Sequence, residues 1–230
     1  MSNSIKARLH EITHRIAETA RRSGRQPDEI KLLPVSKTHP AAILREAMAA
    51  GITCFGENKV QEAESKIAEL GHESLEWHLI GHLQANKARK AVKIFDVIHS
   101  LDSLELGRRL ERICEEVGRA ELQVLVQADL AGEETKSGIS EKDLPDLVEF
   151  LRGCTRLKFT GLMIVPPYFE NAEDVRPFFH RLRNIRDDLC PGGDLSMGMT
   201  HDFEIAIEEG ATIIRVGTAI FGEREYQTNL

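Results

Sequence analysis

The sequence predicts an α/β protein built as a single-domain (β/α)8 TIM barrel with an additional N-terminal helix. The length of the chain, the alternation of apolar and amphipathic segments, and the polar residues that follow the apolar segments support this fold class. The chain has 230 residues, close to the roughly 250 of a typical (β/α)8 barrel. We therefore expect residues 1–230 to form one domain rather than two separate units.

Short apolar segments recur along the chain without the polar alternation of strands that face water on one side. Strands that are buried on both faces of a parallel sheet have this character. We predict them as the eight strands of the barrel: Ile30–Ser36, Ile52–Phe55, Trp77–Ile80, Phe95–Ser100, Leu122–Ala128, Leu157–Val165, Leu195–Met199 and Thr212–Val216.

The segments between these runs have helical periodicity. Near the N-terminus, Ile5, Leu9, Ile12 and Ile16 follow one another at steps of three and four, which predicts a helix over Ser4–Arg22. Further helices are predicted at Ala41–Ala50, Lys59–Leu70, Gln84–Val92, Ser103–Val117, Glu141–Leu151, Val175–Leu189 and His201–Glu209. Because no long helix follows the last strand, we expect the N-terminal helix to cover that gap. A doubly wound open sheet is the competing architecture.

Composition excludes several classes of protein. A net charge of −7 and a pI of about 5.8 argue against a broad nucleic-acid surface, but they allow a local site for one anion. The four cysteines contain no CxxC pair, so we expect neither a compact zinc site nor a disulfide framework. No stretch approaches the roughly 20 apolar residues of a membrane span. Because the N-terminus is charged and lacks a secretory apolar core, we predict a cytoplasmic protein.

Lys37 directly follows the first predicted strand. In a barrel, the carboxyl ends of the strands build the active site. A lysine there is partly desolvated, which lowers its pKa, and a neutral amine attacks carbonyl carbon to form an imine. The alternative is a lysine whose side chain simply extends into solvent.

The last two predicted strands end in residues suited to an anion. Gly198 and Gly217 allow backbone N–H groups to approach a phosphate, and Ser196, Thr200 and Thr218 supply hydroxyl groups. Barrels often bind phosphate at the loops after these strands. Together with Lys37 they suit a phosphorylated aldehyde, although the glycines could serve only to make tight turns.

Other polar residues also end predicted strands. Arg215 would stay charged at neutral pH and could donate to a pyridine nitrogen; a salt bridge with Glu204 or Glu223 is the alternative. Asn58 could line the pocket or cap the following helix. His82 could line the pocket or satisfy a turn.

Seven segments, in order between about residue 5 and residue 225, make a specific set: Ser36-Lys37-Thr38, Phe55-Gly56-Glu57-Asn58, Trp77-His78-Leu79-Ile80-Gly81-His82-Leu83-Gln84, Lys136-Ser137-Gly138, Gly161-Leu162-Met163, Leu195-Ser196-Met197-Gly198-Met199-Thr200 and Arg215-Val216-Gly217-Thr218-Ala219-Ile220-Phe221-Gly222. Together they resemble the pyridoxal phosphate homeostasis protein family. The departures are Lys59 where we expect Tyr, Leu79 for Phe, and Thr200 for Ser.

The resemblance implies a monomeric barrel like the N-terminal domain of alanine racemase. It implies pyridoxal 5′-phosphate (PLP) bound as a Schiff base to Lys37. The resemblance assigns the phosphate to Ser196, Gly217 and Thr218, and it places Arg215 opposite the pyridine nitrogen.

The resemblance also implies a function without catalytic turnover: buffering or delivery of PLP, with effects on vitamin B6 and amino-acid balance and with PLP-dependent apo-enzymes as candidate recipients. A PLP-dependent racemase-like enzyme is the alternative. Racemases of this fold carry a second domain that supplies a tyrosine, whereas this sequence has only Tyr168 and Tyr226, and we expect neither to fill that role. A lysine-dependent aldolase without PLP is a third possibility.

Overall fold

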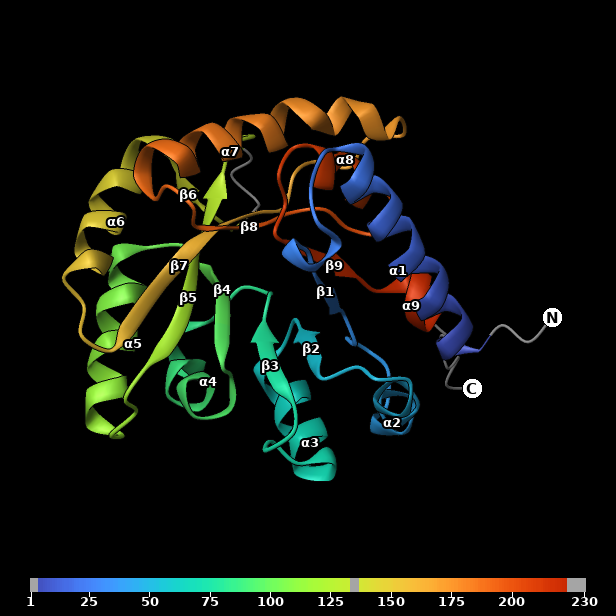
Figure 1. Ribbon diagram of the computed structural model, residues 1–230. Coiled ribbons are helices and arrows are strands. Elements are labelled where there is room, and N and C mark those ends of the chain that lie inside the picture. The colour runs from blue at the N-terminus through green and yellow to red at the C-terminus, as the bar shows by residue number, and fades with distance from the viewer. Residues whose placement is uncertain (1–3, 133–136, 223–230) are drawn as a thin grey trace, which may run out of the picture.

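The structure, a computed structural model, describes residues 4–132 and 137–222. Its strands form a single sheet that nearly closes into a barrel, in the order β1-β9-β8-β7-β5-β4-β3-β2, with β6 beside β5 (Figure 1). Their bounds are β1 (Lys31–Pro34), β2 (Cys54–Glu57), β3 (Glu76–Leu79), β4 (Val97–Leu101), β5 (Leu122–Asp129), β6 (Ile139–Ser140), β7 (Leu157–Ile164), β8 (Asp194–Ser196) and β9 (Ile213–Val216).

All eight predicted strands are present, and every strand pair is parallel. The short strand β6 was not predicted. The ends of the sheet meet at β1 and β2, where the isolated bridge between Val35 and Gly56 joins them. The Ser36 N–H donates to the Gly56 carbonyl at 3.0 Å, immediately after that bridge. The predicted α/β barrel architecture is therefore confirmed, with its closure reduced to one narrow seam.

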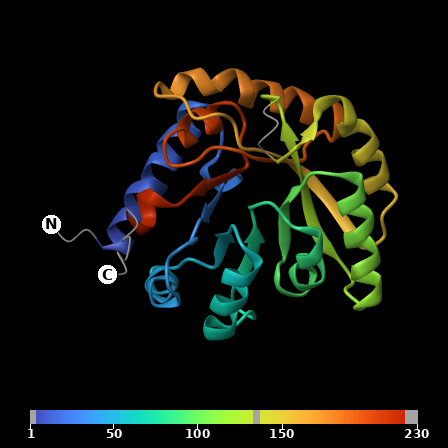
Figure 2. The ribbon, with the colours of Figure 1, turned by 180° about the vertical axis from the view of Figure 1, so that it is seen from behind.

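Helices form a ring around the outside of the sheet (Figures 1 and 2). Their bounds are α1 (Ile5–Arg22), α2 (Ala41–Ala49), α3 (Val60–Leu70), α4 (Ala88–Ile94), α5 (Leu104–Glu116), α6 (Leu144–Arg152), α7 (Arg176–Leu189), α8 (Phe203–Glu208) and α9 (Thr218–Phe221). Single 3-10 turns lie at Pro27–Glu29, Ala85–Lys87, Glu141–Asp143 and Ala172–Val175. None of the helices within the described ranges is both long and apolar enough to cross a membrane.

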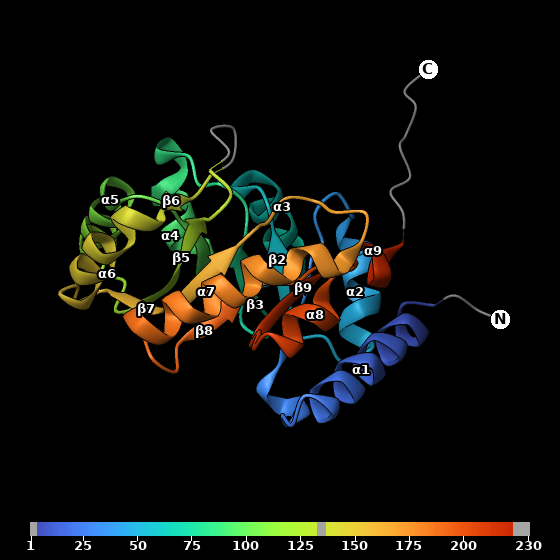
Figure 3. The same cartoon turned by 90° about the horizontal axis from the view of Figure 1, so that it is seen from above.

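The N-terminal helix α1 covers the gap beside the last strand, as the sequence predicts. It packs against α8 and α9 (Figure 3). Arg15 on α1 binds Glu204 on α8, with Nε 3.0 Å from Oε1. The apolar face of Ile5, Leu9, Ile12 and Ile16 is buried in this contact. Burial of these side chains stabilises a helix that has no strand of its own before it.

Two sets of apolar side chains make up the core. The larger set fills the space between the helices and the outer face of the sheet, and includes Phe55 and Trp77. The smaller set points to the other face, inside the barrel, and comprises Leu33, Cys54, Val97, Leu125, Met163 and Ile213. Successive residues of a strand point to opposite faces, so β1, β2, β4, β5, β7 and β9 each have side chains in both sets.

Candidate functional site

The carboxyl ends of β1 and β9 lie side by side at one mouth of the barrel. Pro34 pairs in register with Val216, and the Val35 N–H donates to the Val216 carbonyl at 2.9 Å. A Cβ atom on Gly217 would lie only 3.3 Å from the Val35 carbonyl oxygen. Two residues later, Lys37 is partly buried. The structure therefore brings the segment that carries Lys37 next to the turn that begins at Gly217.

The turn after β9 presents backbone donors. The N–H groups of Gly217, Thr218 and Ala219 donate to no backbone carbonyl within residues 4–132 and 137–222. Thr218 is exposed, so its hydroxyl is also accessible. Adjacent N–H groups of this kind form a concave anion site. The arrangement suits a phosphate group at the position predicted for it.

A second turn, after β8, lies against the first. The Arg215 N–H donates to the Gly198 carbonyl at 2.9 Å, which ties the two turns together. Gly198 has φ of +90°, and a Cβ atom there would lie 2.5 Å from Cβ of Ala206 and 3.0 Å from Cα of Phe203. Only glycine fits both the backbone conformation and the contact with α8. Gly198 thus has a packing role as well as a place at the mouth.

Arg215 and Ser196 form a buried pair below these turns. Arg215 Nη1 donates to Ser196 Oγ at 2.8 Å, and Nη2 donates to the Ile164 carbonyl at 2.8 Å. Burial lowers the pKa of Arg215 to about 10, against the opposing charge of Asp202, so the guanidinium is charged at neutral pH. Glu204, one of the alternative partners, binds Arg15 instead. Glu223, the other, lies outside the described residues.

Two buried histidines extend this pair toward the opposite end of the barrel. His99 Nδ1 lies 2.9 Å from Ser196 Oγ, and His99 Nε2 lies 2.8 Å from His78 Nδ1. Burial lowers the pKa of His78 and lowers that of His99 well below its ordinary value, so both rings are neutral. Because Arg215 can only donate, Ser196 Oγ accepts from it. The single Ser196 hydroxyl proton is therefore directed to His99 or to a ligand oxygen.

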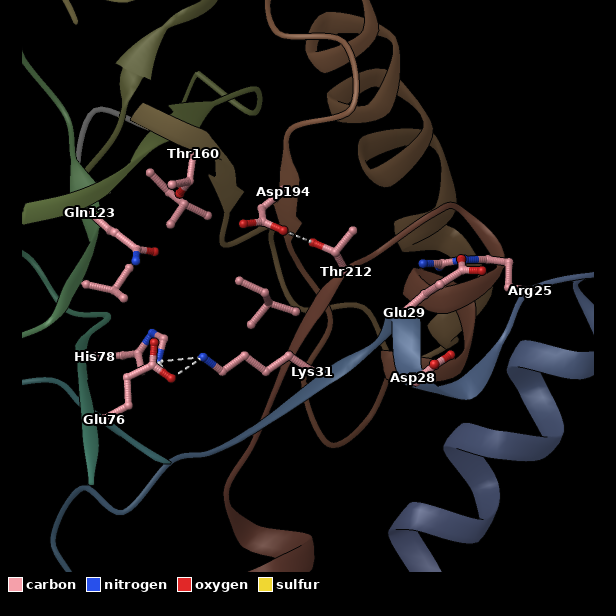
Figure 4. A pocket seen from close by; sticks show the side chains of 13 residues that line it. Arg25, Asp28, Glu29, Lys31, Glu76, His78, Gln123, Thr160, Asp194 and Thr212 are labelled. Atoms are coloured by element: carbon pink, nitrogen blue, oxygen red, sulfur yellow. Dashed lines mark hydrogen bonds and ion pairs between the residues drawn. The ribbon is translucent and has the colours of Figure 1, made fainter. Parts of the chain in front are cut away.

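A cavity of about 400 Å³ lies at the amino ends of the strands, opposite the mouth that carries Lys37 (Figure 4). Lys31, Glu76 and Asp194, the first residues of their strands, line it. Its polar groups bind one another: Lys31 Nζ donates to Glu76, and Thr212 Oγ1 donates to Asp194 at 2.8 Å. These groups already have hydrogen-bond partners, and the amino end of a barrel usually serves stability rather than catalysis. We therefore assign the cavity to the stability of the fold and not to the predicted site.

We expect Glu76→Gln to remove a pH-dependent part of the stability. Hydrogen bonds from His78 and then Lys31 lower the pKa of Glu76 from 4.5 to about 2. The unfolded chain therefore binds a proton more readily, and Glu76 stabilises the fold above pH 4.5, a contribution that is lost as the pH falls toward 2. The expected loss in the variant at pH 6 is about 1 kcal/mol, since water screens a partly exposed carboxylate.

Denaturant unfolding at several pH values checks this prediction. The difference in free energy of unfolding between the wild type and Glu76→Gln should stay constant from pH 6 to about pH 4.5 and then shrink as the pH falls toward 2. A difference that stays constant over this range would contradict it, because an uncharged contact does not titrate.

Asn58 and His82 lie at the same mouth but in different settings. A Cβ atom on Gly81 would lie 2.3 Å from the Asn58 carbonyl oxygen, so the ends of β2 and β3 are in close contact. Helix α3 has Lys59 at its N-cap and no side-chain cap, which excludes the capping role considered for Asn58. His82 Nδ1 lies 3.0 Å from Asp102 Oδ2, a pair that satisfies the turn. The His82 side chain thus has a partner within the turn, and Asn58 as a pocket residue stays a prediction.

A buried ionic cluster next to Lys37 was not predicted from the sequence. Lys66 Nζ lies 2.6 Å from Glu57 Oε1, and Glu57 and Lys66 are 0% and 5% exposed. Burial raises the pKa of Glu57, and the Lys66 ammonium opposes that shift. One signal could have revealed the cluster: Val60, Ala63 and Lys66 follow at steps of three, which places Lys66 on the buried face of α3.

The likeness to known proteins extends over nearly the whole chain. A family model described as the N-terminal domain of alanine racemase matches residues 7–225. The pyridoxal phosphate homeostasis protein of Pseudomonas aeruginosa is 45% identical over 226 residues, 97% of each chain. That of Aquifex aeolicus is 43% identical over 224 residues, covering 95% of this chain and 98% of the relative.

Solved structures agree with these matches. PipY of Synechococcus elongatus, whose structure has PLP bound, is 43% identical with a TM-score of 0.80, covering 90% of this chain and 100% of PipY. An alanine racemase of Clostridium difficile has a TM-score of 0.69 over 98% of this chain and 58% of the racemase. At 14% identity the racemase shares the fold alone. The resemblance seen in the sequence motifs is confirmed, and the chain belongs to the pyridoxal phosphate homeostasis protein family, with the fold of the alanine racemase N-terminal domain.

Proposed function

We propose that this protein binds PLP through a Schiff base on Lys37 and carries or buffers the cofactor for vitamin B6 and amino-acid homeostasis. The observation that carries the proposal is the adjacency of two strand ends: the segment with Lys37 follows β1, and the Gly217 turn follows the neighbouring β9. The PLP found in PipY, a relative of 43% identity, supports the choice of ligand.

The residues at the mouth fit the chemical parts of PLP. PLP supplies an aldehyde that condenses with primary amines and a ring that withdraws electrons. The N–H groups of Gly217 and Thr218, with the hydroxyl groups of Thr218 and Ser196, would hold the phosphate. Arg215, which is buried and cationic, would donate to the pyridine nitrogen. Because the charged guanidinium can only donate, Arg215 would leave that nitrogen unprotonated.

Borohydride reduction followed by peptide mapping tests the proposal directly. The protein is incubated with PLP, reduced, digested and analysed by mass spectrometry. We expect one pyridoxyl adduct, on the peptide that contains Lys37. A protein that shows no visible absorbance band with PLP and yields no adduct would contradict PLP binding and favour a lysine-dependent aldolase.

We expect the protein to show no turnover of free amino acids. The family to which it belongs is named for homeostasis, while alanine racemases share its fold at only 13% to 18% identity. Two-sided proton transfer needs an acid/base group on each face of the ring, and Lys37 serves one face. The measurement is exchange of the α-proton for deuterium with a panel of amino acids, compared with free PLP. Exchange well above that background, lost in Lys37→Ala, would instead establish a racemase-like enzyme.

We also propose that residues 1–230 act as a single-domain monomer in the cytoplasm, with PLP-dependent apo-enzymes as recipients of the cofactor. One sheet contains all the strands of the described chain, and the four cysteines are unpaired, which supports this view. Light scattering of the PLP-loaded protein checks the mass, and transfer of PLP to an added apo-enzyme checks delivery.

A further inference from the structure

We propose that Glu57, Glu62 and Lys66 form a clamp that sets the position of Lys37, and that they act as positioning residues for capture of the aldehyde. We call these three residues the Lys37 clamp. The inference rests on the proposed function, since it concerns the amine that would bind PLP. Neither the family match nor the resemblance assigns this role to them.

Lys66 is the centre of the Lys37 clamp. Its ammonium has three donors, and the structure gives it three acceptors: Glu57 Oε1 at 2.6 Å, Glu62 Oε1 at 2.7 Å and the Ser36 carbonyl oxygen at 2.7 Å. The last of these is the carbonyl of the residue immediately before Lys37. The side chain is only 5% exposed, so water competes little for these bonds.

The Lys37 clamp holds the backbone on both sides of Lys37. On one side, Ser36 is fully buried, and its hydroxyl donates to Glu57 Oε1 at 2.6 Å. On the other side, the Thr38 N–H donates to Glu62 Oε1. Thr38 has φ of +70°, an uncommon value for a residue with a branched side chain. A conformation of this kind persists only where surrounding contacts impose it.

The location of the Lys37 clamp gives it a second task. It lies at the seam of the barrel, where β1 and β2 form no continuous ladder and are joined by the isolated bridge between Val35 and Gly56 and by the Cys54 thiol, which donates to the Leu32 carbonyl. Glu57 ends β2, whereas Glu62 and Lys66 belong to α3. The three side chains therefore connect β2 and α3 to the segment after β1. The pairing of β1 with β9 holds the strand as far as Val35, and the three side chains restrain the next residues, Ser36 and Thr38, on either side of Lys37.

Stability of the fold alone does not explain the Lys37 clamp. Burying the Glu57 carboxylate and the Lys66 ammonium costs desolvation energy, and well-packed apolar side chains often serve a fold equally well. One oxygen, Glu57 Oε2, is buried and has no hydrogen-bond partner in the described part of the chain. What the charged cluster provides is directional bonding to specific backbone atoms. Those atoms flank Lys37.

The test compares two ligands that differ only in the group that Lys37 attacks. PLP carries an aldehyde, whereas pyridoxine 5′-phosphate carries an alcohol and binds only through the phosphate and ring contacts. We expect Lys66→Met to weaken PLP binding about tenfold or more, since misplacing a reacting group by an ångström has effects of this size. Pyridoxine 5′-phosphate should bind the variant within about twofold of the wild type, because its contacts do not involve Lys37.

The matched control is Lys90→Met. Lys90 lies on α4 and binds Glu64, which is on α3 like Lys66, with Nζ 2.7 Å from Oε2. Unlike Lys66, Lys90 is well exposed. This variant should bind both ligands as the wild type does. If Lys66→Met does not fold, Glu57→Gln combined with Lys66→Met replaces it, because the double variant leaves no unpaired buried charge.

Equal losses for the two ligands would overturn the positioning role, since they would indicate general damage to the barrel. Unchanged affinity for PLP would overturn it as well. Failure of the proposed function looks different: the wild-type protein itself would show no visible band with PLP, before any variant is compared.

Discussion

Replacing Lys37 by alanine is expected to abolish covalent PLP binding completely while leaving weaker, reversible binding. The amine is the only group at this mouth to which we assign bond formation, whereas the Gly217 turn would still hold the phosphate through backbone N–H groups. The visible absorbance band and the borohydride adduct should both disappear. Equilibrium dialysis should then give the affinity of the variant for PLP without the covalent bond. We expect this affinity to be close to that of the wild type for pyridoxine 5′-phosphate.

Lys59→Ala is the control for this experiment. Lys59 is an exposed lysine that begins α3, near the same end of the barrel. Its removal should leave the band and the adduct unchanged. A Lys37→Ala protein that still forms a stoichiometric adduct on one other lysine would show that the wrong amine has been assigned.

Gly198→Ala is expected to destabilise the protein by about 3 kcal/mol and to weaken phosphate binding. Two causes act together: a side chain at positive φ costs about 1 kcal/mol, and overpacking costs about 2 kcal/mol more. The close contacts are with Phe203, the first residue of α8, and with Ala206 in the same helix, which follows the turn that carries Gly198. Relief of the clash would move that turn away from the Gly217 turn. Chemical denaturation and competition of inorganic phosphate with PLP measure the two effects.

Gly192→Ala separates the two causes. Gly192 also has positive φ, +78°, but a Cβ atom there would meet nothing within 4 Å. We expect this variant to lose about 1 kcal/mol and no affinity for PLP. If Gly198→Ala lost no more stability than Gly192→Ala, the predicted clash of the new side chain with α8 would be contradicted.

Local patterns in the sequence predict most of the fold. The eight apolar runs correspond to the eight principal strands, because a strand buried on both faces needs apolar side chains on both. The steps of three and four in α1 predict a buried face, and the structure buries it. The two-residue strand β6 and the four-residue helix α9 were missed, because segments this short carry no measurable periodicity.

Residues at the mouth were found for a topological reason. Parallel strands bring all their carboxyl ends to one edge, so Lys37, Arg215 and Gly217 could be placed together without coordinates. The partners of these residues could not be placed. Ser196 binds His99 across 97 positions of the chain, and no periodicity links positions so far apart. The Lys37 clamp was missed because a buried lysine is rare enough to be assumed exposed.

The sequence by itself determined which segments become strands, which helical faces are buried and which polar residues share the mouth, because these follow from local spacing and from the parallel arrangement of strands. The tertiary structure alone decided how Lys66 and Glu57 hold the backbone around Lys37, how the buried Arg215 guanidinium donates to Ser196 and to the Ile164 carbonyl, and how narrow the seam between β1 and β2 is. Hydrogen bonds between distant segments depend on distances of a few tenths of an ångström, and only packing sets those distances.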